Sequence, residues 1–301
     1  MAKRCCILVL GVHRSGTSAL TRVINLLGAA LPKNLMPPTP NNNEVGFWEP
    51  QNLWLLHDQM LREAGSRWND WRKLDLGILP PERIVFYKSE IRRLIAEEFN
   101  DAPLFVLKDP RICRFVPLYQ GILGDMGIDV KYILIHRHPR AVEASLKVRN
   151  KMPEACSQLL WLRYVLEAEK TTRNWTRKFL SYEALLTDTE RQVEELIDAL
   201  ALTKVESSRA TMAEIKSSLR QDLQHQKAVG NVAPTFPWLE VSWLVLEEAM
   251  NTGDLRVAAL QSIERAFAKA EGIAVSKDYT EASALALMLA GEQAEIGVPG
   301  N

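Results

Sequence analysis

Four short apolar runs alternate along the chain with stretches whose apolar residues recur at helical spacing. The runs have the length and aliphatic content of buried strands, and the spaced stretches indicate helices with one apolar face. Strands that alternate with helices predict an α/β fold, in which helices wrap a parallel sheet through right-handed crossovers. The four predicted strands are residues 5–10, 104–107, 130–135 and 178–183.

The chain divides at a stretch rich in glycine and proline. Residues 230–234 are typical of a linker, and we expect an α/β domain over residues 1–230 and a helical C-terminal extension over residues 231–301. Trp238 and Trp243 of the extension are expected in the core, and its helices could serve as a cap or as the surface of a homodimer. The predicted helices are residues 20–27, 50–61, 81–99, 139–149, 153–175, 189–200, 207–219, 238–250, 255–270 and 280–292.

The first predicted strand runs into a polar loop bounded by Gly11 and Gly16. A strand, a glycine-bounded loop and a helix N-terminus form an anion site, because their N–H groups face the ligand and the helix dipole favours negative charge. A glycine turn without a ligand is the alternative, but such a turn needs no polar side chains. This loop and the start of its helix carry five, namely His13, Arg14, Ser15, Thr17 and Ser18.

The spacing of this loop is nearly that of the nucleoside triphosphate loop G-x-x-x-x-G-K-[ST]. Thr17 stands where that motif has its phosphate-binding lysine, and Arg14 is the only cation in the loop. The loop is therefore suited to a phosphate donor other than a nucleoside triphosphate.

Two further polar clusters follow predicted elements. Glu49 lies beside Trp48 where a long loop over residues 32–48 meets a helix, so it is a candidate base or a carboxylate that stabilises the helix dipole. Lys108, Asp109 and Arg111 follow the second strand, at the carboxyl edge where open α/β sheets bind ligands. A surface turn with an Asp–Arg pair is the alternative for this cluster.

The third strand ends before Arg137, and Ser145 lies eight residues later, two turns into the next helix. A guanidinium and a hydroxyl placed in this way can face one phosphate. Tyr182, at the exit of the fourth strand, either contacts a bound nucleotide or packs against the strand end.

Composition narrows the function classes. The 37 basic and 37 acidic residues balance, which argues against nucleic acid as a partner. The four cysteines have neither disulfide nor metal spacing, so a reduced, cytoplasmic protein without a metal is expected. No apolar run approaches the roughly 20 residues of a membrane span.

The segment Arg14-Ser15-Gly16-Thr17-Ser18 resembles the 5′-phosphosulfate loop of bacterial-type P-loop sulfotransferases that use 3′-phosphoadenosine 5′-phosphosulfate, PAPS. The Arg137/Ser145 pair is similar to the 3′-phosphate site of the same family. The resemblance covers about residues 5–225 and implies a P-loop-kinase-like sheet whose first strand is central.

The resemblance also implies roles for the candidate residues. His13, Arg14, Ser15, Gly16, Thr17, Ser18, Arg137, Ser145 and Tyr182 would bind PAPS, and 3′,5′-adenosine bisphosphate, PAP, would be the product. Glu49 would be the general base, Arg14 and Lys108 would stabilise charge in catalysis, and Trp48, Glu49, Asp109 and Arg111 would contact the acceptor. The acceptor would be a hydroxyl or amine of a glycan, glycolipid or small molecule, with residues 32–48 and 68–71 lining its site.

Two other functions remain open at this point. A P-loop kinase for a small molecule explains the fold and the glycine loop, but it leaves Thr17, Arg137 and Ser145 without a purpose. An inactive nucleotide-binding protein is the other alternative, and it gains if Glu49 is not a base.

Overall fold

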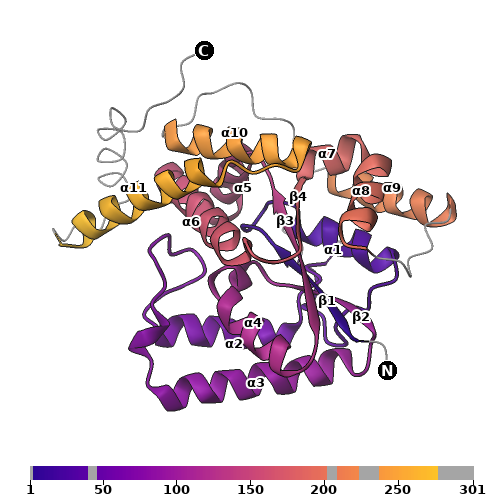
Figure 1. Cartoon of the computed structure of the whole chain (residues 1–301), viewed down its shortest axis with the longest axis horizontal. Helices are drawn as coiled ribbons and strands as arrows, with labels where there is room; N and C mark the ends of the chain where they lie inside the picture. The colour runs from indigo at the N-terminus through magenta and orange to yellow at the C-terminus, as the bar shows by residue number, and fades with distance from the viewer. Residues whose placement is uncertain (1–2, 40–45, 202–208, 224–236, 277–301) are drawn as a thin grey trace.

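A four-stranded parallel sheet forms the centre of the computed structural model, which describes residues 3–39, 46–201, 209–223 and 237–276 (Figure 1). The strand order is β2-β1-β3-β4, so β1 is hydrogen-bonded on both sides. This confirms the predicted α/β fold and the central place of the first strand. The strands are β1 (Cys5–Leu10), β2 (Leu104–Lys108), β3 (Asp129–His136) and β4 (Arg177–Ser181).

Side chains of β1 alternate between two hydrophobic layers, as the period of a strand requires. Ile7 and Val9 belong to one layer, and Cys6, Leu8 and Leu10 belong to the other. The Ile7 layer is covered by α1 (Thr17–Leu26), α7 (Tyr182–Thr187), α8 (Thr189–Ala199) and α9 (Arg209–Leu223).

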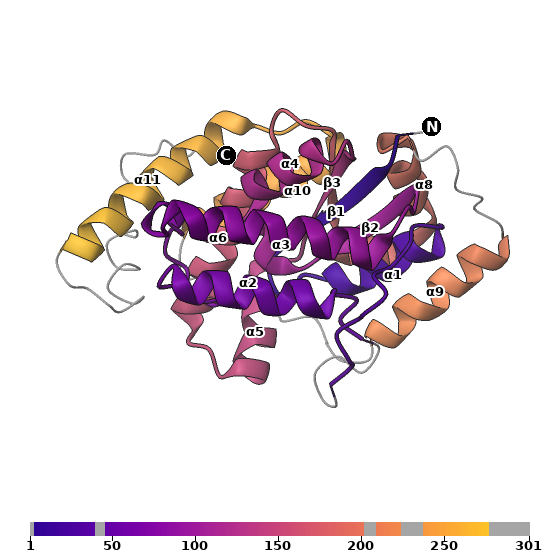
Figure 2. The ribbon, with the colours of Figure 1, turned by 90° about the horizontal axis from the view of Figure 1, so that it is seen from below.

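More helices cover the opposite layer, where the larger hydrophobic cluster lies. Two of them, α2 and α3, lie side by side across the sheet (Figure 2). The helices of this layer are α2 (Gln51–Glu63), α3 (Pro81–Phe99), α4 (Val116–Asp125), α5 (Pro139–Asn150), α6 (Glu154–Thr172), α10 (Pro237–Thr252) and α11 (Val257–Ser276).

The predicted fourth strand is too long by two residues. β4 ends at Ser181, and Tyr182 begins α7. The Ser181 hydroxyl accepts a hydrogen bond from the Ala184 N–H, which is the usual N-cap arrangement and starts the helix there.

The connection from β2 to β3 contains two elements that the sequence analysis did not name. The first is the 3₁₀ helix η2 (Pro110–Arg114), whose Arg111 N–H is capped by the Asp109 carboxylate, and the second is α4. A further 3₁₀ turn, η1 (Leu76–Ile78), lies within the loop after α2. β2 and β3 both pair in parallel with β1, so the chain must cross over between them, and α4 lies in that crossover.

The C-terminal helices α10 and α11 join the same hydrophobic cluster as α6. Trp238 is 3% exposed and Trp243 is 8% exposed, which confirms them as core residues. The predicted linker at 230–234 and the predicted helix at 280–292 lie outside the described residues, and the division into two domains stays a prediction. Across the described ranges, no helix has the length and apolar character needed to span a membrane.

Candidate functional site

The loop between β1 and α1 has two residues with left-handed backbone. Arg14 has φ 72°, and Gly16, which precedes the first residue of α1, has φ 89°. Gly11 is also sterically required, because a Cβ there would lie 2.6 Å from Ser15 Oγ and 2.7 Å from the Ile135 carbonyl oxygen. The tight turn directs the N-terminus of α1, with its unsatisfied N–H groups, toward the carboxyl edge of the sheet.

The hydroxyls of this loop do not all face outward. Ser15 is fully buried, and its Oγ donates to the Val12 carbonyl at 2.7 Å. Thr17 is only 4% exposed. Ser18 donates to the Phe47 carbonyl at 3.2 Å and accepts from Lys108 at 3.0 Å. In this conformation Ser15 shapes the loop, and Ser18 connects it to the segment before Glu49.

Arg14 contacts both residues of the second predicted phosphate site, Arg137 and Ser145. Its Nε donates to Ser145 Oγ at 2.7 Å, and Arg137 donates to its carbonyl oxygen at 3.1 Å. The strand β3 and the helix α5 thus bring the second predicted phosphate site against the first loop. Two guanidinium groups, a hydroxyl and the amides of α1 form a cation-rich cluster that suits a phosphorylated ligand.

Tyr182 packs directly on the loop. A Cβ at Gly16 would lie 2.0 Å from Tyr182 Cδ2, and the Arg137 guanidinium lies over the Tyr182 ring at 5.1 Å from its centroid. The structure therefore places Tyr182 as packing for Gly16 and Arg137. A contact with a nucleotide base remains a prediction.

Lys108 and Glu49 form a buried ion pair. Lys108 Nζ donates to Glu49 Oε1 at 2.7 Å, to the Phe47 carbonyl at 2.7 Å and to Ser18 Oγ at 3.0 Å. These three bonds use all the donors of an ammonium group. Lys108 therefore holds the Glu49 segment against α1, and it must release one of these partners to reach a ligand.

Glu49 is placed at the end of its loop by both side-chain and backbone contacts. The Met36 N–H donates to the Glu49 carbonyl at 2.8 Å, and Arg111 lies 3.9 Å from Glu49 Oε2. Burial raises the pKa of Glu49 above its ordinary value, and the positive charge of Lys108 offsets part of that effect. A carboxylate with a raised pKa is better matched to accepting a proton near neutral pH.

Behind Glu49 lies a second buried network, centred on Asp109. Arg111 pairs with Asp109 at 3.0 Å and with Asp58 at 2.7 Å. His57 Nδ1 lies 2.7 Å from Asp109 Oδ2, and His57 Nε2 lies 2.6 Å from the Tyr119 hydroxyl. Burial opposes the charged form of Asp109, but Arg111 and the His57 hydrogen bond hold its pKa well below the usual range.

The same network explains why Asp109 and His57 face no acceptor in this conformation. Both side chains are 0% exposed, so they act on Arg111 and, through it, on Glu49. The sequence analysis missed Tyr119 because it named no helix over residues 116–125. The apolar spacing of Val116, Tyr119 and Leu123 would have indicated one.

Replacing His57 with alanine should lower the free energy of unfolding by about 3–5 kcal/mol, because it leaves Asp109 Oδ2 and the buried Tyr119 hydroxyl without their shared partner. Urea denaturation measures the change. Tyr119→Phe removes only the hydroxyl of the same network and should cost about 1–3 kcal/mol. A loss below about 1 kcal/mol for His57→Ala would contradict the importance of the network.

An aromatic and basic group lies on the side of the loop that carries His13. The His13 and Trp68 ring centroids are 4.6 Å apart, and the Arg149 guanidinium lies 5.4 Å from the Trp68 ring centroid. Sequence reasoning placed Trp68 near the acceptor but gave no role to Arg149. Its position one turn after Ser145 on α5 was the available signal.

Trp48 packs against α1. Its backbone has φ 58°, and the Arg22 guanidinium of α1 lies 5.3 Å from its ring centroid. A role of Trp48 in acceptor binding remains a prediction.

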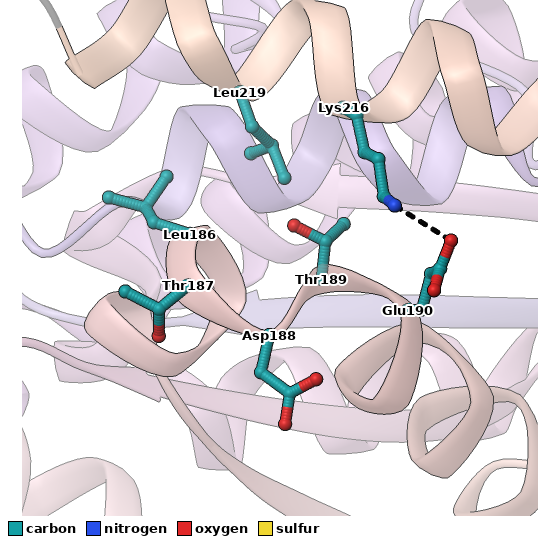
Figure 3. Close-up of a pocket in the computed structure, with 7 residues that line it drawn as sticks. All are labelled: Leu186, Thr187, Asp188, Thr189, Glu190, Lys216 and Leu219. Atoms are coloured by element: carbon teal, nitrogen blue, oxygen red, sulfur yellow. Dashed lines mark hydrogen bonds and ion pairs between the residues drawn. The ribbon is translucent and has the colours of Figure 1, made fainter.

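A separate hollow lies where the turn between α7 and α8 meets α9 (Figure 3). Its volume of about 260 Å³ is below the roughly 300–1,000 Å³ of usual ligand pockets. Lys216, its only cation, is paired with Glu190 at 2.7 Å. The hollow shares no residue with the cluster around Arg14 and Glu49.

Comparison with solved structures gives distant likenesses, several of them to sulfotransferases. The chain is similar to the sulfotransferase domain from the curacin biosynthetic pathway, at 16% identity and a TM-score of 0.43, over 87% of this chain and 97% of that domain. It is similar to the sulfotransferase domain of the Synechococcus PCC 7002 olefin synthase, at 16% identity and 0.43, over 88% and 96%. Mouse sulfotransferase SULT7A1 complexed with PAP matches at 13% identity and 0.36, over 76% and 70%.

No protein-family model and no curated protein sequence matches the chain. These TM-scores are all below 0.5, so the likenesses support no conclusion about this chain. The function is therefore argued from this chain's own residues.

Proposed function

We propose that this protein is a PAPS-dependent sulfotransferase that moves a sulfuryl group to a hydroxyl or amine of a small-molecule or glycan acceptor. The observation that carries the proposal is the meeting of Arg137 and Ser145 on Arg14, within hydrogen-bond distance, at the glycine loop of α1. PAPS has a phosphosulfate and a separate 3′-phosphate, and this cluster offers cations from two different elements for two such groups.

The same cluster is less suited to a nucleoside triphosphate. A P-loop kinase uses a lysine after the second glycine of the loop, and Thr17 stands there with 4% of its surface exposed. The cations that could replace that lysine are Arg14 and Arg137, the residue after β3. The kinase reading leaves the contacts of Arg137 and Ser145 with Arg14 without a role.

In the proposed reaction, the sulfur–oxygen bond to the 5′-phosphate breaks and a bond from sulfur to the acceptor oxygen or nitrogen forms, so PAP leaves. Glu49 would accept the proton of the acceptor, and its buried, raised-pKa carboxylate supports that role. Arg14 and the amides of α1 would stabilise the negative charge that grows on the leaving phosphate oxygen. Lys108 would keep Glu49 in place and would release Ser18 or Phe47 to assist that charge.

The 3′-phosphate assignment has a direct test in Arg137. Arg137→Ala should weaken PAP binding roughly 10- to 150-fold, the effect of losing a charge-assisted hydrogen bond, and should change AMP binding less than about threefold. Calorimetric titration of both nucleotides measures the difference. Ser145→Ala should act in the same direction with a smaller change.

Two results would contradict the assignment. Equal losses for PAP and AMP would mean that Arg137 acts only through the Arg14 loop. An unchanged PAP affinity would remove Arg137 from the nucleotide site. The surface variant Arg92→Ala, on the exposed side of α3, should leave both affinities at the wild-type value and serves as the control.

A further inference from the structure

Arg149 differs from Lys108 and Arg111, the other cations near Glu49. Lys108 pairs with Glu49, and Arg111 pairs with Asp109 and Asp58. Among the described residues, Arg149 forms no ion pair with a carboxylate. Its Nε donates to the neutral side chain of Asn150 at 2.6 Å.

The guanidinium of Arg149 is half-buried rather than free in water. Burial and the nearby charges of Arg14 and Arg111 lower the pKa of Arg149 to about 10, and the charge of Glu49 acts in the opposite direction. Arg149 therefore stays positive at neutral pH in surroundings that already have excess positive charge. A partly buried positive charge without a negatively charged partner is unfavourable in free energy, and an anionic group of a ligand would supply that partner.

The group around Arg149 lies on the acceptor side of the loop. Arg149 interacts electrostatically with Glu49, the proposed base, and the Arg149 guanidinium lies over the Trp68 ring. Trp68 in turn contacts the ring of His13, the residue before Arg14. This layer of guanidinium, indole and imidazole would hold a flat or ring-shaped molecule by stacking while Arg149 binds its charge.

His13 supplies a second, independent observation at the same place. Only 8% of its surface is exposed, and its Nε2 has no hydrogen-bond partner among the residues that the structure describes. Burial, together with the charges of Arg111 and Arg149, lowers the pKa of His13 well below its usual value. A neutral imidazole with an unused nitrogen, in contact with Trp68, is suited to a polar group of a ligand.

We propose that Arg149 binds an anionic group of the acceptor, so that the acceptor is a hydroxylated molecule that also carries a carboxylate or another oxyanion. His13 and Trp68 complete this subsite, and Arg149 connects it electrostatically to the carboxylate of Glu49. The inference rests on the proposed function and names the acceptor class of the same site. It assigns Arg149 to the acceptor and leaves the donor to Arg14, Arg137 and Ser145.

The test compares acids with their uncharged amides. Full-length protein and ³⁵S-labelled PAPS are incubated with three matched pairs, each a hydroxylated acid and its amide, built on a phenol, a hexuronic acid and an aliphatic alcohol. The wild type should use at least one acid with kcat/KM roughly 10- to 100-fold above that of its amide. Arg149→Gln should remove this preference, and Arg149→Lys should keep part of it.

Two controls separate this inference from its alternatives. Lys147→Gln removes a positive charge from an exposed position of the same helix and should leave the acid preference unchanged. PAP affinity, measured by calorimetry, should stay within about threefold in Arg149→Gln, because an arginine that contacts only the acceptor contributes nothing to PAP binding.

Three results would overturn the inference. In the first, no acid in the panel is used better than its amide. In the second, Arg149→Gln keeps the wild-type acid preference. In the third, Arg149→Gln weakens PAP binding tenfold or more, which would place Arg149 in the donor site. Wild-type protein that fails to bind PAP at all would instead contradict the proposed function itself.

Discussion

Replacing Glu49 with glutamine should lower kcat for sulfuryl transfer by roughly 10²–10⁴-fold, the usual contribution of a positioned general base. Glutamine keeps the shape of the side chain and an oxygen that can accept from Lys108, so the fold around the ion pair should persist. PAP affinity should change by less than about threefold, because the proposed function gives Glu49 a contact with the acceptor and none with PAP. Initial rates with labelled PAPS and calorimetry with PAP measure the two quantities.

The pH profile gives this substitution a second readout. Glu49 acts as a base only when ionised, and burial raises its pKa above the ordinary value. The wild-type rate should therefore fall on acidification at a higher pH than an ordinary glutamate would give, and Glu49→Gln should lack that fall. Glu97→Gln, on the exposed face of α3, is the matched control and should behave as wild type. Unchanged turnover in Glu49→Gln would remove Glu49 as the base.

Replacing Gly16 with alanine should lower the free energy of unfolding by about 2–5 kcal/mol and weaken PAP binding at least tenfold. About 1–2 kcal/mol comes from the left-handed backbone at φ 89°, and about 1–3 kcal/mol comes from the overlap of the new Cβ with Tyr182. Relief of that overlap must move α7 or the start of α1. Either movement displaces the amides that would face the donor.

Gly28 offers a matched control at the other end of the same helix. It also has positive φ, at 101°, but a Cβ there would meet nothing within 4 Å. Gly28→Ala should therefore cost only the backbone part, about 1–2 kcal/mol, and leave PAP affinity at the wild-type value. Urea denaturation and PAP titration of both variants separate strain from steric overlap. Equal effects of the two substitutions would contradict the packing role of Tyr182.

Much of the fold is predictable because its signals are local. The run at residues 5–10 is apolar on both faces, as a central strand covered on both sides must be. The spacing of Gly11 and Gly16 directly indicates the loop that follows it. Helix α3 matches its predicted residues because Pro81 and the apolar spacing mark it clearly. The carboxyl-edge rule correctly placed the segments of Lys108 and Arg137 next to the loop.

The details of the site depend on contacts between distant residues, which a single sequence does not show. Lys108 was predicted to reach a sulfuryl group, yet the structure gives all three of its donors to Ser18, Phe47 and Glu49. Arg137 and Ser145 were predicted to face a phosphate, and no pattern in the sequence indicated that both also contact Arg14. These pairings join positions 59 to 131 residues apart and require the folded sheet to exist first.

Calorimetric titration of the wild-type protein with PAP, and separately with ATP and Mg²⁺, tests the central claim most directly. The proposed function predicts tight binding of PAP, little response to ATP, and a matching rise in melting temperature with PAP alone. Tight binding of ATP with Mg²⁺ and none of PAP would contradict the assignment of Arg14, Arg137 and Ser145. The P-loop kinase reading would then replace it.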